Sequence, residues 1–235
     1  MISVCMATYN GGKFIREQLE SILSQLSPDA EIVIADDGST DDTLAVVESL
    51  GDSRICVLPA EKHLGVIYNY ERALQASKGE IVFLADQDDI WLSGKVEKTL
   101  AALNEADLVT HDAWMLRPSG ESDSSWVCSG KLSDIRAYRS GVVANWWKNT
   151  FTGCCMAFRR NILDKALPFP KNLPMHDQWL GVVAEKNFKV KSMDEPLVEY
   201  RQHSTNATHI GNSPAGVFQK IKWRLNLAKA LFLNV

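Results

Sequence analysis

The chain has 235 residues, of which 46% are hydrophobic, and its formal net charge is −4. A chain of this length fits one large domain, or one domain with an appendage, and its apolar content is ample for a buried core. The negative charge argues against a general nucleic-acid-binding protein, because such proteins are usually basic.

The first half of the chain alternates short apolar runs with helical patterns of apolar residues. We expect strands at residues 2–8, 31–35, 54–58 and 81–85. We expect helices at 13–26, after a cap at Ser39 or Thr40, and in the segment that carries Tyr68 and Tyr70. This alternation indicates βαβ units, and therefore an α/β fold with a mostly parallel, Rossmann-like central sheet flanked by helices.

A second region begins near Leu92 and has a less regular pattern. We expect a helix at 95–105, a strand at 108–114, a helix that ends at Glu185, and short strands at 190–193 and 197–200. The polar segment 117–126 indicates a loop over a neighbouring site or a disordered flap.

The run Ile81–Trp91 is the centre of the pattern, because an apolar strand ends there in three carboxylates. Asp86 and Asp88 are two residues apart, so they share a face of an extended chain. In an open α/β sheet, ligands bind at the carboxyl ends of the strands. Carboxylate oxygens suit Mg²⁺ or Mn²⁺, and these ions often bridge a carboxylate to substrate phosphates. The alternative is a solvated acidic loop after a strand.

Three more polar clusters stand where apolar runs stop, at Thr8–Asn10, Asp36–Asp37 and Arg201–Asn206. The clusters after the first, second and central strands should converge on one edge of a parallel sheet. Their convergence predicts a phosphate-bearing ligand held through a divalent ion. Asp36 or Asp37 would accept a hydrogen bond from a base or ribose, and Tyr9 would stack on the base. The alternative for residues 37–39 is a turn and a helix cap.

Three ordered motifs carry a family resemblance: Met6-Ala7-Thr8-Tyr9-Asn10, Ile34-Ala35-Asp36-Asp37-Gly38-Ser39-Thr40-Asp41 and Leu84-Ala85-Asp86-Gln87-Asp88-Asp89-Ile90-Trp91. Further matches follow at Thr152–Cys154, His176–Asp177 and Tyr200–His203. Together these motifs resemble glycosyltransferase family 2, and in particular its bacterial rhamnosyltransferase-like members. The resemblance runs from Met1 to about Asn206. It implies a GT-A fold with a nucleotide-binding half at 1–91, an acceptor-binding half at 92–210, and inversion of configuration at the sugar.

The resemblance implies a role for each matching residue. The nucleotide would be held by Ala7, Tyr9, Asp36, Asp37, Asp86, Gln87 and Arg201. The metal, Mn²⁺ or Mg²⁺, would be held by Asp88, Asp86 and His203. Asp177 would be the catalytic base, although an ordinary helix cap is the alternative there. Ala7 stands where proline is common, and Gln178 stands where aromatic residues often follow the base, but neither departure removes a group that the chemistry needs.

The acceptor would contact Gly153, Trp91, Trp179 and His176. Trp146, Trp147 and Trp179 could stack on an acceptor sugar, and a core position is an equal alternative for each of them. His176 is a neighbour that would position Asp177.

The C-terminal segment has a different character, because it is basic and carries no acids after residue 216. Apolar residues recur there at helical spacing: Phe218, Ile221, Leu225, Ala228, Leu231 and Phe232. The pattern predicts an amphipathic helix within 211–235 that lies on an anionic membrane surface. The alternative is a helix that packs on the domain or on a second subunit of a homodimer.

Compartment is indicated by what the sequence lacks. No apolar run is long enough to span a bilayer, and the N-terminus enters an apolar strand without a basic start or a cleavage-like site. The five cysteines have no Cys-x-x-Cys spacing, which indicates reduced, mostly buried thiols. We expect a cytoplasmic protein, peripheral on the inner face of the bacterial cell membrane.

We therefore predict a metal-dependent inverting glycosyltransferase. It would move rhamnose or another hexose from a dTDP- or UDP-linked donor to a glycan or polyprenyl-diphosphate-linked acceptor, in O-antigen or capsule synthesis. The nucleotide stays open, because both bases offer similar edges. One alternative is a strand-end-aspartate phosphotransferase, although its Asp-x-Asp usually follows the first strand. The other is a non-catalytic nucleotide-sugar-binding module.

Overall fold

The structure is a computed structural model, and it describes residues 1–58, 60, 63–119, 125–203, 206 and 216–233. Within these residues its centre is a nine-stranded sheet in the order β3-β2-β1-β4-β8-β6-β9-β5, with β7 paired to β6. The strands are β1 (Ile2–Thr8), β2 (Glu31–Asp36), β3 (Ile55–Leu58), β4 (Ile81–Asp86), β5 (Ile90–Trp91), β6 (Leu108–Pro118), β7 (Trp126–Lys131), β8 (Met156–Arg159) and β9 (Val190–Arg201). The helices are α1 (Ile15–Leu23), α2 (Thr43–Ser49), α3 (Val66–Ala76), α4 (Lys95–Leu103), α5 (Val142–Trp147), α6 (Leu163–Ala166), α7 (His176–Asn187) and α8 (Val217–Leu233).

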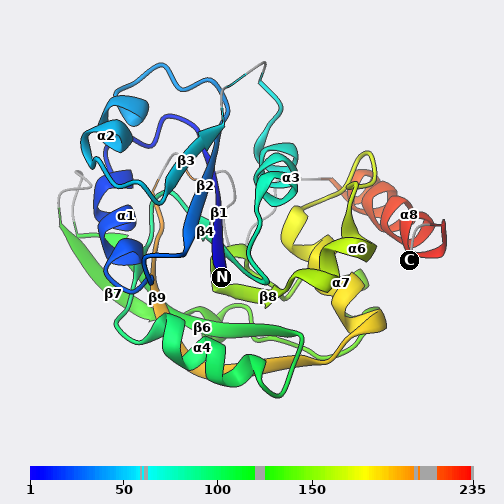
Figure 1. Cartoon of the computed structure of the whole chain (residues 1–235). Helices are drawn as coiled ribbons and strands as arrows, with labels where there is room; N and C mark the ends of the chain where they lie inside the picture. The colour runs from blue at the N-terminus through cyan, green and yellow to red at the C-terminus, as the bar shows by residue number, and fades with distance from the viewer. Residues whose placement is uncertain (59, 61–62, 120–124, 204–205, 207–215, 234–235) are drawn as a thin grey trace.

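The strands β3, β2, β1 and β4 form the parallel part of the sheet that the sequence predicts. Both faces are covered, since Figure 1 shows α1 and α2 on one side of these strands and α3 and α7 on the other. Successive residues of β4 therefore enter two different cores, with Phe83 packed among α1 and α4 and Leu84 packed among α3 and α7. This double burial explains why the strands are continuous apolar runs.

The carboxyl ends of these parallel strands are level. Thr8 at the end of β1 pairs with Asp36 on one side, and Ala7 pairs with Asp86 on the other. The polar residues that follow the three strands therefore emerge at one edge of the sheet, as the sequence predicts.

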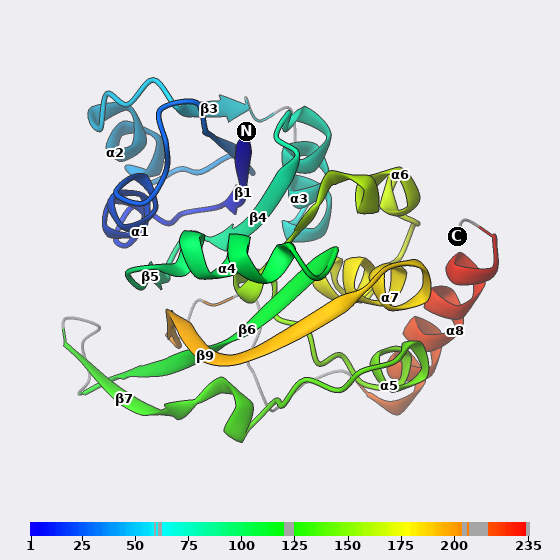
Figure 2. The ribbon, with the colours of Figure 1, turned by 60° about the horizontal axis from the view of Figure 1, so that its bottom comes forward.

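The second half of the sheet is mixed. Strand β8 runs antiparallel to both β4 and β6, while β9 runs parallel to β6 and pairs with β5. Figure 2 shows β6 and β9 as two long neighbouring strands below α4. Strand β9 is continuous from Val190 to Arg201, where the sequence predicts two short strands. The register shifts where Asp112 faces Pro196, and this irregularity accommodates a residue that lacks a backbone N–H.

The segment predicted as a loop at 117–126 is partly sheet. Strand β6 continues to Pro118, which pairs with Trp126 at the start of β7. Residues 120–124 of that segment lie outside the described residues.

Helix α8 confirms the predicted C-terminal helix, but its apolar residues do not form one face. Leu227, Ala230 and Leu231 are buried against the domain, whereas Phe218 and Phe232 are largely exposed. The helix lies beside α5 and α7 in Figure 2, and the Trp146 Nε1–H donates to the Arg224 carbonyl at 2.8 Å. Packing on the domain, the alternative given above, thus accounts for one side of the helix. Across the described ranges, no helix has the length and apolar character needed to cross a membrane.

Candidate active site

A cavity of about 400 Å³ opens at the carboxyl edge of the parallel strands. Most of the residues predicted for the site line it: Ala7, Tyr9, Asp37, Asp86, Gln87, Asp88, Gly153, His176 and Asp177. These residues come from β1, β4, α7 and the loops between, so segments far apart in the chain meet at this edge.

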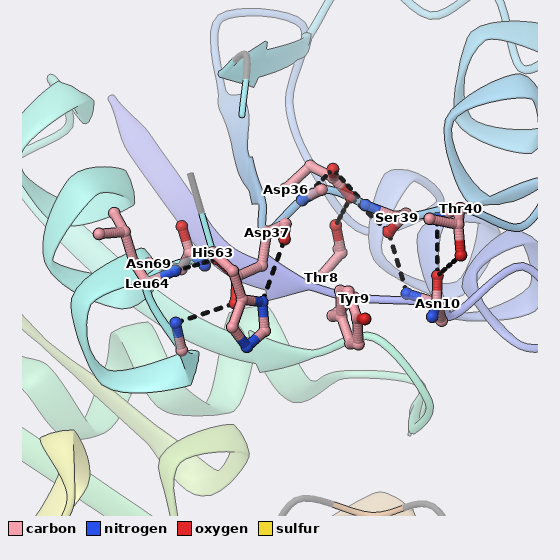
Figure 3. Close-up of polar contacts among 12 residues, drawn as sticks. Thr8, Tyr9, Asn10, Asp36, Asp37, Ser39, Thr40, His63, Leu64 and Asn69 are labelled. Carbon is pink, nitrogen blue, oxygen red and sulfur yellow. Dashed lines mark hydrogen bonds and ion pairs between the residues drawn. The ribbon is translucent and has the colours of Figure 1, made fainter. Parts of the chain in front are cut away.

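Asp36 is used to brace the loop after β2. Its carboxylate accepts hydrogen bonds from the Thr8 hydroxyl at 3.1 Å, the Ser39 hydroxyl at 2.6 Å, and the Gly38 and Ser39 amides. Asp36 is buried and does not line the cavity, which contradicts its predicted contact with the nucleotide. Figure 3 shows this network beside the Asn10 side chain, which accepts from the Thr40 amide.

The predicted helix cap at Ser39 or Thr40 is wrong for the same reason. These hydroxyls serve the Asp36 and Asn10 network, and α2 begins only at Thr43, with Asp42 at its N-cap position.

Asp37 lies at the cavity and draws the loop before α3 toward it. One carboxylate oxygen accepts from the Leu64 amide at 2.7 Å, and the other accepts from the Gly65 amide at 2.9 Å. The same oxygen lies 3.0 Å from His63 Nδ1 (Figure 3). Gly65 has a φ of 80°, a conformation that glycine adopts without strain.

Tyr9 and Gln87 form one wall of the cavity. The Gln87 side chain accepts from the Tyr9 amide at 2.9 Å and donates to the Tyr9 carbonyl at 3.1 Å, which ties the ends of β1 and β4 together. The Tyr9 ring is half exposed and lies 5.1 Å from the His63 ring. An exposed aromatic ring held in this way offers a face to a planar base.

The carboxylates after β4 have three different environments. Asp88 accepts from His203 Nε2 at 2.8 Å and from Asn206 Nδ2 at 2.9 Å. Asp86 accepts from the Tyr70 hydroxyl at 2.6 Å, and burial together with the neighbouring Asp88 charge raises its pKa to about 7. Asp89 is fully buried and accepts from the Arg201 amide.

This acid cluster fits a divalent cation. A bound divalent cation would relieve the repulsion between the Asp86 and Asp88 carboxylates, whose oxygens are the ligands that Mg²⁺ and Mn²⁺ prefer. Possible ligand atoms of Asp86, Asp89 and Cys154 also lie within 4.8 Å of one another. Hydrogen bonding to Cys155 and burial raise the pKa of the Cys154 thiol well above its ordinary value, so it is a poor ligand for these oxygen-seeking ions.

Asp177 lies in the first turn of α7, two residues after the N-cap residue Met175. One of its oxygens accepts from Asn149 Nδ2 at 2.9 Å and from the Gln178 amide at 2.6 Å. Burial raises its pKa, and the nearby Arg136 charge opposes that rise. A carboxylate with a raised pKa, held against a cavity, is suited to accept a proton.

His176 lies beside Asp177 as a neutral, buried ring. It stacks on Tyr70 with the ring centroids 3.9 Å apart, and burial lowers its pKa to about 3. Neither ring nitrogen has a hydrogen-bond partner in the part of the chain that the structure describes. A Cβ added to Gly153 would lie 2.9 Å from His176 Nε2, so the glycine leaves room for the His176 ring to lie against it at the cavity.

Three predicted contact residues do not line the cavity. Trp91 and Trp179 are buried in the core, and the Trp179 Nε1–H donates to the Ala166 carbonyl. Because neither ring has an accessible face, the predicted acceptor contacts of these two residues are wrong, and the core position given as the alternative for Trp179 is confirmed. Arg201 is also buried, where it pairs with Glu17 and lies over the Phe14 ring.

Several residues of the site have no signal in the sequence. Tyr70 follows the apolar pattern of α3, yet its hydroxyl holds Asp86. The sequence pattern places Gln18 on the polar side of α1. The residue is nevertheless buried, and it donates to the Asp86 carbonyl at 2.7 Å. Arg136 lies in a segment without a clear pattern. Each of these roles depends on pairing between distant segments, which local periodicity does not report.

Comparison with known proteins identifies a family and a fold. Residues 3–167 match the family described as "Glycosyl transferase family 2". The chain is 31% identical over 207 residues to an Escherichia coli protein named "UDP-Glc:alpha-D-GlcNAc-diphosphoundecaprenol beta-1,3-glucosyltransferase WfgD", covering 86% of this chain and 77% of that one. It is 28% identical to the putative teichuronic acid biosynthesis glycosyltransferase TuaG of Bacillus subtilis, covering 100% and 93%. It is 28% identical to the dTDP-rhamnosyl transferase RfbG of Shigella flexneri, covering 86% and 72%.

Solved structures support the same fold. The crystal structure of S. aureus TarS 1-349 in complex with UDP-GlcNAc is similar with a TM-score of 0.75 at 20% identity, covering 99% of this chain and 67% of that one. The mannosyltransferase PcManGT from Pyrobaculum calidifontis, in complex with GDP-Man and Mn²⁺, is similar with a TM-score of 0.61 at 21% identity, covering 98% and 61%. At these identities the similarity establishes the GT-A fold.

Proposed function

Because this glycosyltransferase belongs to family 2, we propose that it moves a hexose, with rhamnose as one candidate, from a dTDP- or UDP-linked donor to a glycan or lipid-linked acceptor. The observation that supports this most directly is the meeting of Tyr9, Asp37, Asp88 and Asp177 around one cavity. The relatives named for teichuronic acid biosynthesis and for a diphosphoundecaprenol acceptor support a role in bacterial surface-polysaccharide assembly.

The donor nucleotide is proposed to lie along the strand ends. The Tyr9 ring would cover the base, and Asp37 would fix the His63–Gly65 loop against it. Asp86 and Asp88 would hold the divalent ion. His203 is predicted above as a third metal ligand, but its Nε2 is hydrogen-bonded to Asp88, so it would instead orient the Asp88 carboxylate together with Asn206. A divalent ion bound there supplies Lewis-acid stabilisation to the diphosphate that leaves.

Asp177 is proposed as the base. Its carboxylate would take the proton of the acceptor hydroxyl while that oxygen forms its bond to the anomeric carbon. The bond from that carbon to the diphosphate breaks, and the electron pair leaves with the nucleotide. His176, neutral and buried, would keep the surroundings of Asp177 apolar without competing for the proton.

The sequence predicts two alternative functions. Membership of glycosyltransferase family 2 excludes the phosphotransferase. The binding module remains to be tested, and the discriminating measurement is donor turnover.

The experiment is a thermal-shift panel of nucleotide sugars with and without Mn²⁺, followed by assay of nucleoside diphosphate release. A ligand present at 100 times its Kd stabilises a protein by about 2.7 kcal/mol, so one donor should raise Tm clearly above its competitors. Chelation should remove most of that shift. Binding of a donor without any release of nucleoside diphosphate would support the binding module, and no stabilisation by any nucleotide would contradict the proposal.

The membrane contact predicted for the C-terminal helix is proposed in a revised form. The exposed side of α8 carries Phe218, Leu225 and Phe232, with Lys222 and Lys229 also exposed. An apolar stripe with neighbouring lysines suits the interface of an anionic bilayer. This stripe, defined by these five residues, would hold the enzyme at the membrane where a lipid-linked acceptor is found.

A further inference from the structure

A second cavity, of about 220 Å³, lies on the other side of Asp177. It is formed between α5, the first turn of α7, and α8. It shares Arg136, Met175 and Asp177 with the larger cavity, but it contains none of the residues that follow β1, β2 or β4. The Asp177 carboxyl group is thus approached from two directions.

An inverting transfer requires the donor and the acceptor to reach the reacting carbon from different directions. The acceptor oxygen must reach the anomeric carbon from the face opposite the departing diphosphate, and it must do so in contact with the base. If the donor occupies the larger cavity, the acceptor has to approach Asp177 from the side away from Asp88. The lining of the second cavity meets this condition, because it includes Asp177 but not Asp88.

The lining of the second cavity is aromatic. Trp146, Trp147 and Trp223 all contribute to it, and Trp147 is 60% exposed. The Arg224 guanidinium lies 4.0 Å from the Trp147 ring centroid, and its Nε–H donates to the Trp147 carbonyl at 3.0 Å. Aromatic faces of this kind pack against the apolar face of a sugar ring.

The lining is also basic, although the chain as a whole is acidic. Arg136, Lys220 and Arg224 face the cavity, and among the lining residues Asp177 is the single acid. Within the described ranges, none of the three basic side chains forms an ion pair. This cavity is smaller than the ~300–1,000 Å³ usual for a whole drug-sized ligand, and its lining is basic. It therefore suits one sugar bearing an anionic group rather than a second nucleotide sugar.

From these observations we infer that the cavity between α5, α7 and α8 binds the acceptor, and that the acceptor carries a phosphate or diphosphate next to the sugar that is extended. The sugar lies toward Asp177 among the tryptophans, and the phosphate lies against Lys220 and Arg224. This assignment rests on the proposed function. It also places the stripe of α8 beside the anionic end of the acceptor, where the lipid of a lipid-linked acceptor would continue.

The test is a binding measurement with two matched probes, a short-chain alkyl diphospho-N-acetylglucosamine and the alkyl N-acetylglucosaminide of the same chain length. Quenching of tryptophan fluorescence reports binding, because three tryptophans line the cavity. We expect the diphosphate probe to bind about 100-fold more tightly than the neutral probe, the ratio expected for two hydrogen bonds to charged groups at about tenfold each.

Variants of α8 supply the controls. Lys220→Gln and Arg224→Gln should each weaken the diphosphate probe about tenfold, whereas Lys222→Gln on the exposed side of the helix should change it little. Lys220→Arg keeps the charge and should bind like the unaltered chain. All four variants should retain the thermal shift given by the nucleotide.

Three results would overturn the inference. One is equal weakening by Lys222→Gln and Lys220→Gln, which would indicate general charge attraction. Another is displacement of the probe by an equal concentration of inorganic phosphate, which would indicate a free-anion site. The third is equal binding of the two probes. Loss of the nucleotide thermal shift in the unaltered chain would instead count against the proposed function, so the two failures can be told apart.

Discussion

The Asp177 carboxyl group, which is proposed as the base, also lowers the stability of the folded chain. Burial raises its pKa in the folded chain, so the ionised form is less stable there than in the unfolded chain. Because the pKa is raised by folding, stability is lost as the pH rises from the unfolded pKa through the folded pKa. A residue of this kind is retained for chemistry rather than for folding.

Replacement of this carboxyl group by an amide should separate its effect on transfer from its effect on stability. We expect Asp177→Asn to lower the rate of transfer by about 10²–10⁴-fold, the usual contribution of a general base. Its Tm at neutral pH should rise, and the gain should shrink as the pH falls through the raised pKa of Asp177 and be absent below the ordinary aspartate pKa. Scanning calorimetry and a nucleotide-release assay measure the two. Substantial turnover by the variant would remove Asp177 from the role of base.

Arg136 should set the acid limb of the pH profile. Its positive charge opposes the effect of burial, so Arg136→Gln should raise the pKa of Asp177 further. Since the base must be ionised to accept a proton, activity should begin to fall at a higher pH in this variant than in the unaltered chain. Arg136→Lys keeps the charge and is the matched control. Identical acid limbs of kcat/KM in all three proteins would contradict this coupling.

At the scale of elements, α8 shows how one helix can have two apolar sides. The sequence predicts a single face, but the helix buries Leu227 and Leu231 while Leu225 and Phe232 point outward. Periodicity alone did not distinguish them, because the tail has enough apolar residues for both sides. Only the positions of α5 and α7 decide which residues are covered.

The outward side of α8 gives a prediction about membranes. Leu225→Ser with Phe232→Ser should reduce flotation with vesicles rich in phosphatidylglycerol by more than about tenfold, because full burial of each side chain is worth about 1.5–3 kcal/mol. Flotation with neutral vesicles should be weaker for every protein, since nearby lysines add about 1 kcal/mol each at an anionic surface. Val127→Ser, an exposed apolar residue of β7, is the control. Equal flotation of the double variant and this control would exclude the stripe as the contact.

The strands of the sheet differ in how well the sequence predicts them. The strands β1, β2 and β4 were predictable, because burial on both faces leaves long apolar runs in the chain. Strand β8 was not, since Met156–Arg159 lies in a longer aromatic and apolar segment without alternation. The continuity of β9 was hidden by Pro196, which only a register shift in the folded sheet accommodates.

At the scale of the whole molecule, the convergence of strand ends was predictable from topology, whereas the hydrogen bonds were not. A parallel sheet brings the residues after β1, β2 and β4 together whatever their side chains are. Whether Asp36 or Asp37 faces the cavity depends on one residue of register and on the loop that each carboxylate holds. The pairing of Asp88 with His203 joins residues 115 positions apart, and only the folded sheet creates it.

The placement of β8 has a mechanical consequence. Through it, hydrogen bonds run without interruption from the edge at β3 to the edge at β5, so the parallel and the mixed halves of the sheet share one frame. Swinging one half against the other about a hinge would break the pairing of Ile81–Phe83 with Ala157–Arg159. Any opening and closing around the substrates therefore falls to the loops and helices at the rim, while the frame beneath stays rigid.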